Sequence, residues 1–495
     1  MIRLSELLLG LECRVIGDDK ISVGGISYDS RNIRKNDIFF AVKGHNTEGG
    51  LYVESALKSG AAAVVSENEI DLPGKTLIVV SDIKSALARI SANFYGHPDK
   101  ELLVVGITGT NGKTTTTYFI ESIFNNIFRK TGVIGTVNYR YSGKVMPAPN
   151  TTPQSSDVYS LLREMADHKN EVAVMEVSSH ALDLKRVEGV EFDVAVYSNL
   201  TQDHLDFHRT MENYFNAKAK LFTNLNQNNK KIPKFAIINK DDEWGRKLIS
   251  LTNAATVLTY GIHSPADIYA ENIRISSKST EFILQTPVGH KKIRIPHIGE
   301  HNVYNAMAAA GVALSQGVSL EAVIAGLEGA PMVPGRLERV EAGQPYTAVV
   351  DYAHTDDALK NVLSSLRKLN PARLITVFGC GGDRDRTKRP LMGAVATELS
   401  DFVFVTSDNP RTEDPQKIAL DIETGIRKFN RNNYQVIIDR EKAIAAAINM
   451  AQKGDVILLA GKGHETYQII GKEKIHFNDA EIANKYISLS VKTHA

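Results

Sequence analysis

The sequence has few cysteines and no long apolar run. Its 495 residues include two cysteines, Cys13 and Cys380, which are too few for a disulfide framework or a cysteine-only zinc site. No apolar run reaches the ~18–20 residues of a membrane-spanning helix, and the N-terminus lacks the segments of a signal peptide. We therefore expect a cytoplasmic protein in a reducing compartment, without membrane insertion.

Net charge is nearly absent as well. The 58 Lys and Arg residues and 57 Asp and Glu residues leave a formal charge of +1. Nucleic-acid binding usually needs a basic excess, so this balance argues against such a partner, although it allows a local pocket for a small anion. Hydrophobic residues make up 43% and charged residues 23%, a globular composition that excludes disordered and fibrous classes.

Length and turn signals predict three domains. At ~100–200 residues per domain, a chain of 495 residues holds about three. Turn clusters near residues 98 and 332 mark the boundaries. The expected domains are residues 1–98, 99–332 and 333–495.

The hydrophobic pattern predicts an α/β fold in each domain. The first is small and mixed, with strands 37–42 and 61–65 and a helix over 52–59. The central domain has apolar runs typical of a parallel sheet buried on both faces, at 102–107, 172–177, 194–197 and 235–238, with helices over 114–124 and 303–314. Residues 255–295 alternate and predict antiparallel strands. The third domain alternates helices with strands at 348–350, 374–378, 402–406, 436–438 and 456–459, which predicts a Rossmann-like sheet.

A phosphate loop joins the first central strand to its helix. Glycines let backbone N–H groups converge on phosphate oxygens, and the helix N-terminus adds partial positive charge. Lys113 would neutralise the β/γ-phosphates, and the Thr114 hydroxyl would bind Mg²⁺. The strict pattern is not met, because position 107 is Ile and Gly106 lies one residue too far upstream, so a turn that merely caps a helix is the alternative. The loop reads Thr108-Gly109-Thr110-Asn111-Gly112-Lys113-Thr114.

Two further polar groups follow neighbouring strands. Glu176 ends one predicted strand, and His204 lies in the loop after the next. Both would share a sheet edge with Thr114, where they could hold Mg²⁺ beside a γ-phosphate. Either residue alone is more often structural, and it is their conjunction with the phosphate loop that favours a nucleotide triphosphate site.

The sequence resembles the Mur ligases of peptidoglycan synthesis over nearly its whole length. The resemblance is carried by the phosphate loop, Asn150-Thr151-Thr152-Pro153, Glu176-Val177-Ser178-Ser179-His180, residues 199–208 and 217–222, His301-Asn302-Val303-Tyr304-Asn305, Pro334-Gly335-Arg336, Asp351-Tyr352-Ala353-His354, residues 381–386, Asp408-Asn409-Pro410-Arg411 and residues 461–465. It implies a P-loop ATPase domain between a UDP-binding and an amino-acid-binding domain. The implied reaction is ATP-dependent amide formation through an acyl phosphate, in a chain expected to act as a monomer.

The resemblance also implies site residues. Lys113, Glu176 and His204 would serve catalysis together with Lys218, which matches a carbamylated lysine and would join Thr114, Glu176 and His204 around Mg²⁺. Without the resemblance, a solvated surface charge is the usual reading of Lys218. Asn302, Asn305 and Arg336 match positions near ATP, although a helix cap is the alternative for Asn302. Positions that hold UDP-N-acetylmuramoyl-L-alanyl-D-glutamate are matched by Tyr28, Ser30, His45, Asn150, Thr151, Thr152, Ser178 and Arg186.

The third domain carries the residues that would choose the amino acid. Arg411 offers a planar fork for a carboxylate, and Asp408 an acceptor for an ammonium group. In the resembling family, Asp-Asn-Pro-Arg marks enzymes that add meso-diaminopimelate. The expected set is Arg384, Asp408, Asn409, Pro410, Arg411, Gly461 and Glu465.

Several other functions stay open on the sequence. A ligase that adds L-lysine, another Mur ligase and a folylpolyglutamate synthetase would share the phosphate loop. A nucleotide-binding switch protein would need the loop but not Lys218 or the third-domain residues, and a kinase would stop at phosphate transfer.

Overall fold

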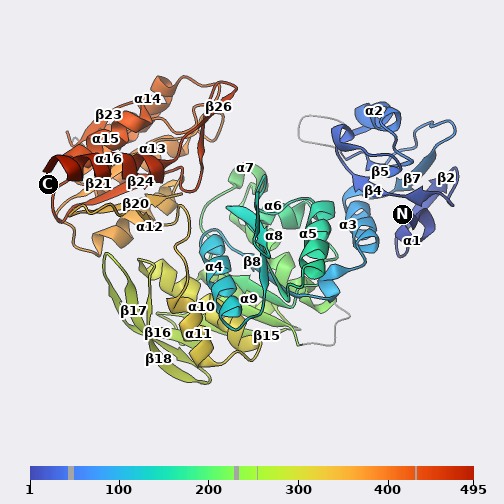
Figure 1. Ribbon diagram of the computed structural model, residues 1–495, viewed down its shortest axis with the longest axis horizontal. Helices are drawn as coiled ribbons and strands as arrows, with labels where there is room; N and C mark the ends of the chain where they lie inside the picture. The colour runs from blue at the N-terminus through green and yellow to red at the C-terminus, as the bar shows by residue number, and fades with distance from the viewer. Residues whose placement is uncertain (43–48, 228–232, 254, 430–431, 495) are drawn as a thin grey trace.

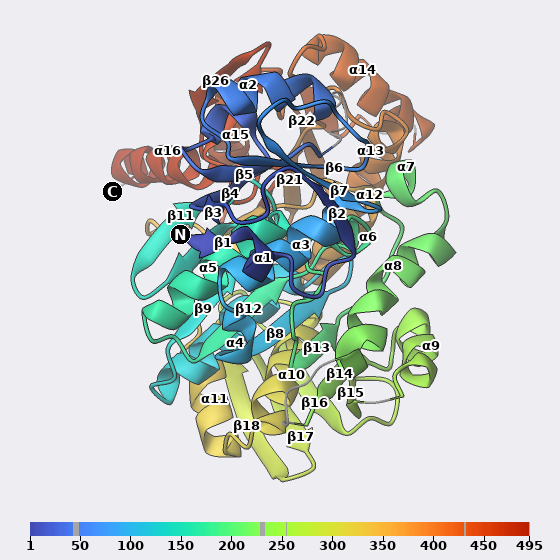
Figure 2. The same ribbon diagram turned by 90° about the vertical axis from the view of Figure 1, so that its right-hand side faces the viewer.

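The computed structural model describes residues 1–42, 49–227, 233–253, 255–429 and 432–494. The chain forms three large sheets, and Figure 1 shows them in three lobes, with the N-terminal and C-terminal lobes on either side of the central one. In the view of Figure 2, the N-terminal lobe lies in front of the C-terminal lobe. The architecture is that of three α/β domains, as predicted. Within the described part of the chain, no helix is both long enough and apolar enough to cross a bilayer.

The N-terminal sheet has five strands in the order β2-β7-β6-β5-β4, and only β2 runs antiparallel to its neighbour. Helix α3 packs Leu87 and Ile90 into the same core as Ile38 and Phe40 of β5. The elements are β1 (Ile2–Arg3), α1 (Leu4–Leu7), β2 (Cys13–Ile16), β3 (Ser22–Val23), β4 (Gly25–Ser27), β5 (Asp37–Phe40), α2 (Val53–Lys58), β6 (Ala63–Ser66), β7 (Thr76–Val80) and α3 (Ile83–Phe94). The predicted strands and helix of this domain are present, with ends shifted by one or two residues.

The central sheet has eleven strands, and its middle is parallel from β9 through β12, β8, β13 and β14 to β15. The strands are β8 (Leu103–Thr108), β9 (Thr131–Ile134), β10 (Asn138–Tyr141), β11 (Lys144–Pro147), β12 (Val172–Glu176), β13 (Val194–Tyr197), β14 (Phe235–Asn239), β15 (Thr256–Gly261), β16 (Ile268–Ile275), β17 (Thr280–Thr286) and β18 (Gly289–Ile295). The helices are α4 (Lys113–Asn126), α5 (Ser155–Asp167), α6 (Ser179–Asp183), α7 (Leu205–His208), α8 (Met211–Thr223), α9 (Glu243–Leu251), α10 (Glu300–Ser315) and α11 (Leu320–Glu328).

The antiparallel prediction for residues 255–295 is right for β16, β17 and β18 and wrong for β15. Strand β15 pairs parallel with both β14 and β16. The physical reason is the connection between β14 and β15. Helix α9 carries the chain back to the end of the sheet at which β14 begins, so β15 runs in the same direction as β14. The alternation in the sequence reflects partial exposure of the strand rather than its direction.

The C-terminal sheet has the order β19-β20-β24-β21-β22-β23, and all pairs except β19–β20 are parallel. Its elements are β19 (Glu338–Arg339), β20 (Thr347–Asp351), α12 (Asp356–Arg367), β21 (Leu374–Phe378), α13 (Lys388–Leu399), β22 (Phe402–Val405), α14 (Pro415–Ile426), β23 (Tyr434–Val436), α15 (Arg440–Met450), β24 (Val456–Ala460), β25 (Tyr467–Ile470), β26 (Glu473–His476) and α16 (Asp479–His494). The Rossmann-like prediction is confirmed, although β23 ends at Val436, where the predicted strand begins.

A buried ion pair attaches the last helix to this sheet. The Arg440 guanidinium donates to both carboxylate oxygens of Asp479, at 2.8 and 2.6 Å, and to the Ala460 carbonyl at 2.9 Å. Both charged side chains are 0% exposed. The pair therefore joins α15, α16 and the end of β24 within the core.

We expect Asp479→Ala to lower the free energy of unfolding of the C-terminal domain by about 3–5 kcal/mol, because it leaves a buried guanidinium without its counter-charge. Urea denaturation followed by circular dichroism measures the loss. Lys485→Ala is the control, since it removes an exposed pair with Glu441 from the same helix and should stay close to wild type. Equal losses in the two variants would contradict a special role for the buried pair.

Candidate functional site

The phosphate loop lies between β8 and α4, as predicted. Gly109 and Gly112 have φ values of 147° and 88°, which an L side chain adopts only with strain. A Cβ at Gly109 would collide with the Ser198 hydroxyl, and one at Gly112 with the Asn305 side chain. Asn199 holds the loop from β13, because its carbonyl accepts the Thr110 N–H at 2.8 Å. Both glycines are therefore required by conformation and by space.

Lys113 and Thr114 begin α4 at this loop. The Lys113 ammonium donates to the carbonyls of Gly109 and Thr110 at 2.9 and 2.8 Å. Desolvation lowers the pKa of Lys113, and the nearby Glu176 carboxylate opposes that shift. The lysine is thus folded over the loop whose N–H groups would face a phosphate.

Glu176 lies at the end of β12 and is 1% exposed. It accepts hydrogen bonds from the Thr114 hydroxyl at 3.1 Å, the Thr136 N–H at 2.8 Å and the Thr136 hydroxyl at 2.9 Å. Thr136 follows β9 and was missed by the sequence analysis, because a single threonine after a short strand gives no signal. The predicted meeting of Glu176 with Thr114 is present in the structure.

Lys218 is buried, unlike its neighbour Lys220. Lys218 is 1% exposed, and its amine donates to the Gly109 carbonyl at 2.9 Å and lies 4.5 Å from the Tyr214 ring centroid. Lys220 instead pairs with Asp183 at the surface. Burial holds the pKa of Lys218 well below its usual range, and the charge of Lys113 lowers it further. The surface-charge alternative is therefore wrong for Lys218.

His204 approaches the same region from the loop after β13. It has a left-handed backbone with φ 53°, and its ring packs edge-on against His180 at 4.7 Å between centroids. Desolvation lowers the pKa of His204 to about 4, against the opposing charge of Asp203. Its imidazole is therefore neutral at physiological pH, the form that can bind a metal ion.

Two donors near the loop, the Thr114 hydroxyl and the Glu176 carboxylate, are oxygen groups of the kind that Mg²⁺ prefers. The His204 imidazole and the Lys218 amine offer nitrogen, which suits Mg²⁺ less well. No group of three His, Cys, Asp or Glu side chains close enough to share a metal occurs among the described residues. An additional anionic ligand would have to come from a modified lysine or from a phosphate.

The three residues expected near the nucleotide lie around α4. Asn305 donates to the Asn302 side chain at 3.0 Å, and Thr116 donates to Asn305 at 3.4 Å. Asn302 donates to the Ile298 carbonyl at 2.8 Å, but α10 begins at Glu300 after Gly299, so the helix-cap alternative for Asn302 is wrong.

Arg336 reaches this region from the C-terminal side of the chain. It donates to the Thr114 hydroxyl at 3.4 Å and lies over the Tyr352 ring at 5.0 Å. The guanidinium therefore connects the segment before β19 to the first residues of α4.

A second group of predicted residues gathers beside Glu176. The Thr152 hydroxyl donates to the Glu176 carbonyl at 2.8 Å and accepts the Ser178 N–H at 3.1 Å. Arg186 donates to the Thr152 carbonyl at 3.0 Å, and its Nε is buried without a partner. Thr151 meets Thr136 at 3.2 Å, and the Asn150 carbonyl accepts from Tyr139 at 2.6 Å.

Tyr28 of the first domain contacts the central domain. Its hydroxyl donates to Asp157 of α5 at 2.7 Å and so crosses between domains. No pattern in the sequence indicated Asp157 as its partner. Ser30 begins a short 3₁₀ helix that Asp29 caps. His45 lies outside the described residues.

The predicted amino-acid residues form a cluster at the carboxyl ends of β22 and β24. Asn409 donates to Glu465 at 2.9 Å, and the backbone carbonyl of Asp408 accepts from Gln468 at 2.6 Å. Gly461 has φ 112°, and a Cβ there would lie 3.4 Å from the Asp408 carboxylate. Lys462 lies between these carboxylates and was not among the predicted site residues.

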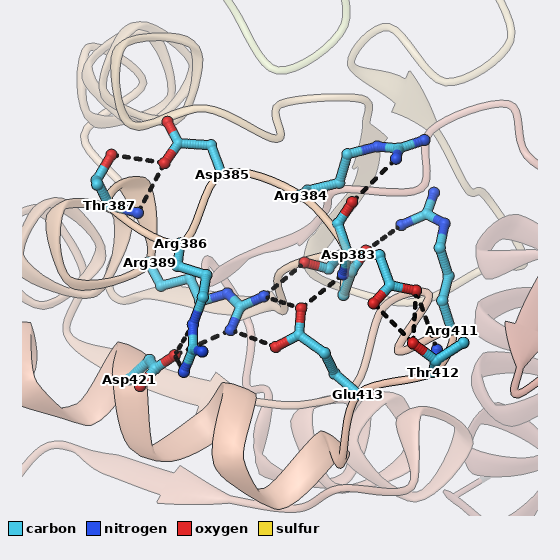
Figure 3. A network of polar contacts seen from close by, with 12 residues as sticks. Asp383, Arg384, Asp385, Arg386, Thr387, Arg389, Arg411, Thr412, Glu413 and Asp421 are labelled. Atoms are coloured by element: carbon cyan, nitrogen blue, oxygen red, sulfur yellow. Dashed lines mark hydrogen bonds and ion pairs between the residues drawn. The ribbon is translucent and has the colours of Figure 1, made fainter. Parts of the chain in front are cut away.

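Arg384 and Arg411 approach each other from two loops (Figure 3). A Cβ at Gly381 would lie 3.0 Å from Nη1 of Arg411 and 3.8 Å from Cγ of Arg384, so both side chains pass beside this glycine. Arg411 donates to the Gly382 carbonyl at 2.7 Å, and Arg384 to the Asp383 carbonyl at 3.0 Å. Pro410 is buried, and a Cβ at Gly382 would collide with its carbonyl oxygen.

A buried arginine holds these two loops together (Figure 3). Arg389 is 0% exposed and donates to Glu413 and Asp421 at 2.9 Å each. Glu413 also accepts the Asp383 N–H at 2.6 Å, and Asp383 in turn accepts the Thr412 hydroxyl at 2.8 Å. This clamp orients the loop that carries Arg384 against the one that carries Arg411.

Three segments match signatures of one family. Residues 22–95 match the catalytic domain described for the Mur ligase family, residues 107–313 its middle domain and residues 335–463 its glutamate ligase domain. A curated UDP-N-acetylmuramoyl-L-alanyl-D-glutamate--2,6-diaminopimelate ligase from Bacillus velezensis is 44% identical over 489 residues, which is 98% of this chain and 99% of that protein.

Solved structures agree with these sequence matches. A structure of UDP-N-acetylmuramoyl-L-alanyl-D-glutamate--2,6-diaminopimelate ligase is 34% identical, with a TM-score of 0.69 over 96% of both chains. The ADP complex of the MurF ligase from Thermotoga maritima is 19% identical, with a TM-score of 0.66 over 95% of this chain and 98% of that one, and shows likeness of fold alone.

The ion pairs of Arg389 with Glu413 and Asp421 should stabilise the protein less in acid. Hydrogen bonds from Arg389 lower the pKa of Glu413 from an ordinary 4.5 to about 2. The stability that Glu413 contributes is therefore present above about pH 4.5 and is lost as the pH falls towards 2. We expect the melting temperature of Glu413→Gln to fall less than that of wild type between pH 5 and 2.5, as melting curves will measure.

Glu398→Gln on α13, an exposed substitution, is the control and should follow wild type. Parallel curves for wild type and Glu413→Gln would contradict the contribution of the clamp.

Proposed function

Because the chain belongs to the Mur ligase family, we propose that it joins meso-2,6-diaminopimelate to UDP-N-acetylmuramoyl-L-alanyl-D-glutamate with the use of ATP. It is an ATP-dependent ligase of peptidoglycan precursor synthesis. The observation that carries this function is the 44% identity to a ligase of that name over 98% of the chain. The relative is named for diaminopimelate, which favours this amino acid over L-lysine.

The reaction has to activate a carboxylate, which is a poor electrophile. A carboxylate oxygen of the dipeptide attacks the γ-phosphorus of ATP, and ADP leaves. The amine of the amino acid, having lost a proton, then attacks the carbonyl carbon of the acyl phosphate, and the tetrahedral intermediate expels phosphate. Lys113 and the N–H groups of the phosphate loop orient the phosphates and offset their charge.

We assign Thr114, Glu176, His204 and Lys218 to Mg²⁺. The ion would neutralise phosphate charge during the transfer. Lys218 is suited to carbamylation, because a neutral amine can attack CO₂ and release one proton, leaving a carbamate. Its burial and lowered pKa support this assignment. The carbamate would add a second anionic oxygen ligand to that of Glu176.

Further residues of the site are assigned to ATP and to the muramoyl-dipeptide. Asn302, Asn305 and Arg336, together with residues 108–114, are assigned to ATP. Thr151, Thr152, Ser178 and Arg186, with Asn150, are assigned to the muramoyl-dipeptide, and the unpartnered Nε of Arg186 supports an anionic ligand there.

The domains are assigned one substrate each. Residues 1–98, with Tyr28, Ser30 and His45, would bind the UDP group, residues 99–332 ATP and residues 333–495 the amino acid. One chain carries every assigned set, so a monomer would suffice. We place the reaction in the cytoplasm, where ATP and UDP-linked precursors occur.

The central test is phosphate release. We expect release only when ATP, UDP-N-acetylmuramoyl-L-alanyl-D-glutamate and meso-diaminopimelate are all present, with much less when L-lysine replaces diaminopimelate. Release without an amino acid would indicate a kinase, and equal rates with lysine would indicate a lysine-adding ligase. Release without the muramoyl-dipeptide would indicate a nucleotide hydrolase.

Arg411→Ala should impair use of diaminopimelate far more than binding of ATP. An unpaired buried charge costs about 2–5 kcal/mol, so kcat/KM for diaminopimelate should fall by roughly 30- to 3,000-fold at about 1.4 kcal/mol per tenfold. Steady-state kinetics with each substrate varied measure this. Arg427→Ala changes an exposed arginine of the same domain and should leave both constants unchanged. An unaltered preference for diaminopimelate in Arg411→Ala would refute the assignment.

Activity should depend on CO₂ through Lys218. We expect enzyme depleted of CO₂ and bicarbonate to lose most of its activity and to recover when bicarbonate is added. Lys218→Ala should be inactive in both conditions, and Lys220→Ala should behave as wild type. Density for a carbamate at the Lys218 Nζ in a crystal structure is the direct check. Full activity after depletion, with unmodified Nζ density, would exclude carbamylation.

A further inference from the structure

Lys462 is a fully buried lysine at the centre of the amino-acid cluster. Its ammonium lies 3.1 Å from Oε2 of Glu465, 3.2 Å from Oδ1 of Asn409 and 3.5 Å from Oδ1 of Asp408, and its side chain is 0% exposed. A buried ammonium is costly unless charged partners compensate it. The cost implies that the surrounding residues are arranged around this charge.

Hydrogen bonds and a close backbone approach fix the positions of the groups around Lys462. Asn409 donates to the same Glu465 oxygen that faces Lys462, at 2.9 Å, and accepts the Ile469 N–H at 3.0 Å. Gly463, with φ 52°, follows the lysine, and a Cβ there would collide with Tyr352. The ammonium is therefore held in one place relative to both carboxylates.

The charges of this cluster do not balance without a ligand. Asp408 and Glu465 carry two negative charges, and Lys462 cancels one of them. One negative charge is left, next to the arginine loops that carry Arg384 and Arg411. A cluster with one net negative charge thus lies beside two guanidinium groups, a pattern that matches a group bearing both an ammonium and a carboxylate.

We propose that Lys462 is a positioning residue that sets the amino-acid specificity of the ligase. This inference rests on the proposed function. Diaminopimelate and lysine differ in one carboxylate, so the end that does not react is zwitterionic in diaminopimelate and a lone ammonium in lysine. By cancelling one carboxylate, Lys462 makes the pocket too weakly negative to favour a lone ammonium. By binding Glu465 and Asn409, it also keeps their oxygens oriented towards the substrate.

The proposal predicts a change in preference rather than a general loss. Lys462→Met keeps the length of the side chain and removes its charge, which leaves two negative charges in the pocket. We expect the ratio of kcat/KM for meso-diaminopimelate to that for L-lysine to fall at least about tenfold, through the KM values, while KM for ATP stays within about twofold of wild type. An unchanged ratio in folded Lys462→Met would overturn the proposal.

Two further variants separate charge from packing. Lys462→Met combined with Glu465→Gln restores one net negative charge, so the ratio should move back towards wild type even if the absolute rates stay low. Lys234→Met is the matched control, because Lys234 is also a buried lysine paired with a carboxylate, Asp193, but lies in the central domain. It should lower stability and leave the ratio unchanged.

Glu465→Gln alone keeps the test decisive if Lys462→Met does not fold. This variant leaves Asp408 and Lys462 in balance, so lysine should be disfavoured further and the ratio should rise. A ratio that stays constant or falls would overturn the proposal. Wild type is assayed first: if it does not use diaminopimelate, the proposed function fails, whereas an unchanged ratio in the variants of an active enzyme defeats only the role of Lys462.

Discussion

The rest of the central site depends on the hydrogen bonds that Glu176 accepts. It accepts hydrogen bonds from the helix that follows the phosphate loop and from the loop after β9, while its own backbone carbonyl accepts from Thr152. One buried anion thereby joins the residues assigned to ATP, to Mg²⁺ and to the dipeptide. Gly135 leaves the space that this carboxylate occupies, because a Cβ there would meet its Oε1. The positions assigned to the two substrates that react with each other thus share one buried group.

Buried cations organise the sites in a similar way. Arg389 and Lys462 are each almost completely buried, and each faces an oxygen of a loop that carries predicted site residues. Burial makes such a charge sensitive to its partners, so the surrounding loops adopt the arrangement that compensates it. The net charge of +1 for the whole chain conceals these local charges, since each is matched within a few ångströms.

The sequence predicted what short-range patterns encode. The phosphate loop was predicted because glycine, lysine and threonine occur together between a buried strand and a helix, and the carboxyl ends of parallel strands must share one edge of a sheet. It did not reveal Thr136, Asn199 or the link from Tyr28 to Asp157, since these contacts join segments that are distant along the chain. The direction of β15 was mispredicted because it depends on how the connection through α9 crosses the sheet. The periodicity of the strand's own residues does not record that direction.

By itself, the sequence determined the three α/β domains, the phosphate loop and the order of motifs that identifies the family. Only the tertiary structure decided which of two neighbouring lysines, Lys218 or Lys220, is buried beside the phosphate loop, and that Lys462 lies between two carboxylates. The physical reason is that a pattern along the chain records residue types and spacing, whereas the charge state and chemical role of a lysine depend on desolvation and on partners that only folding brings together.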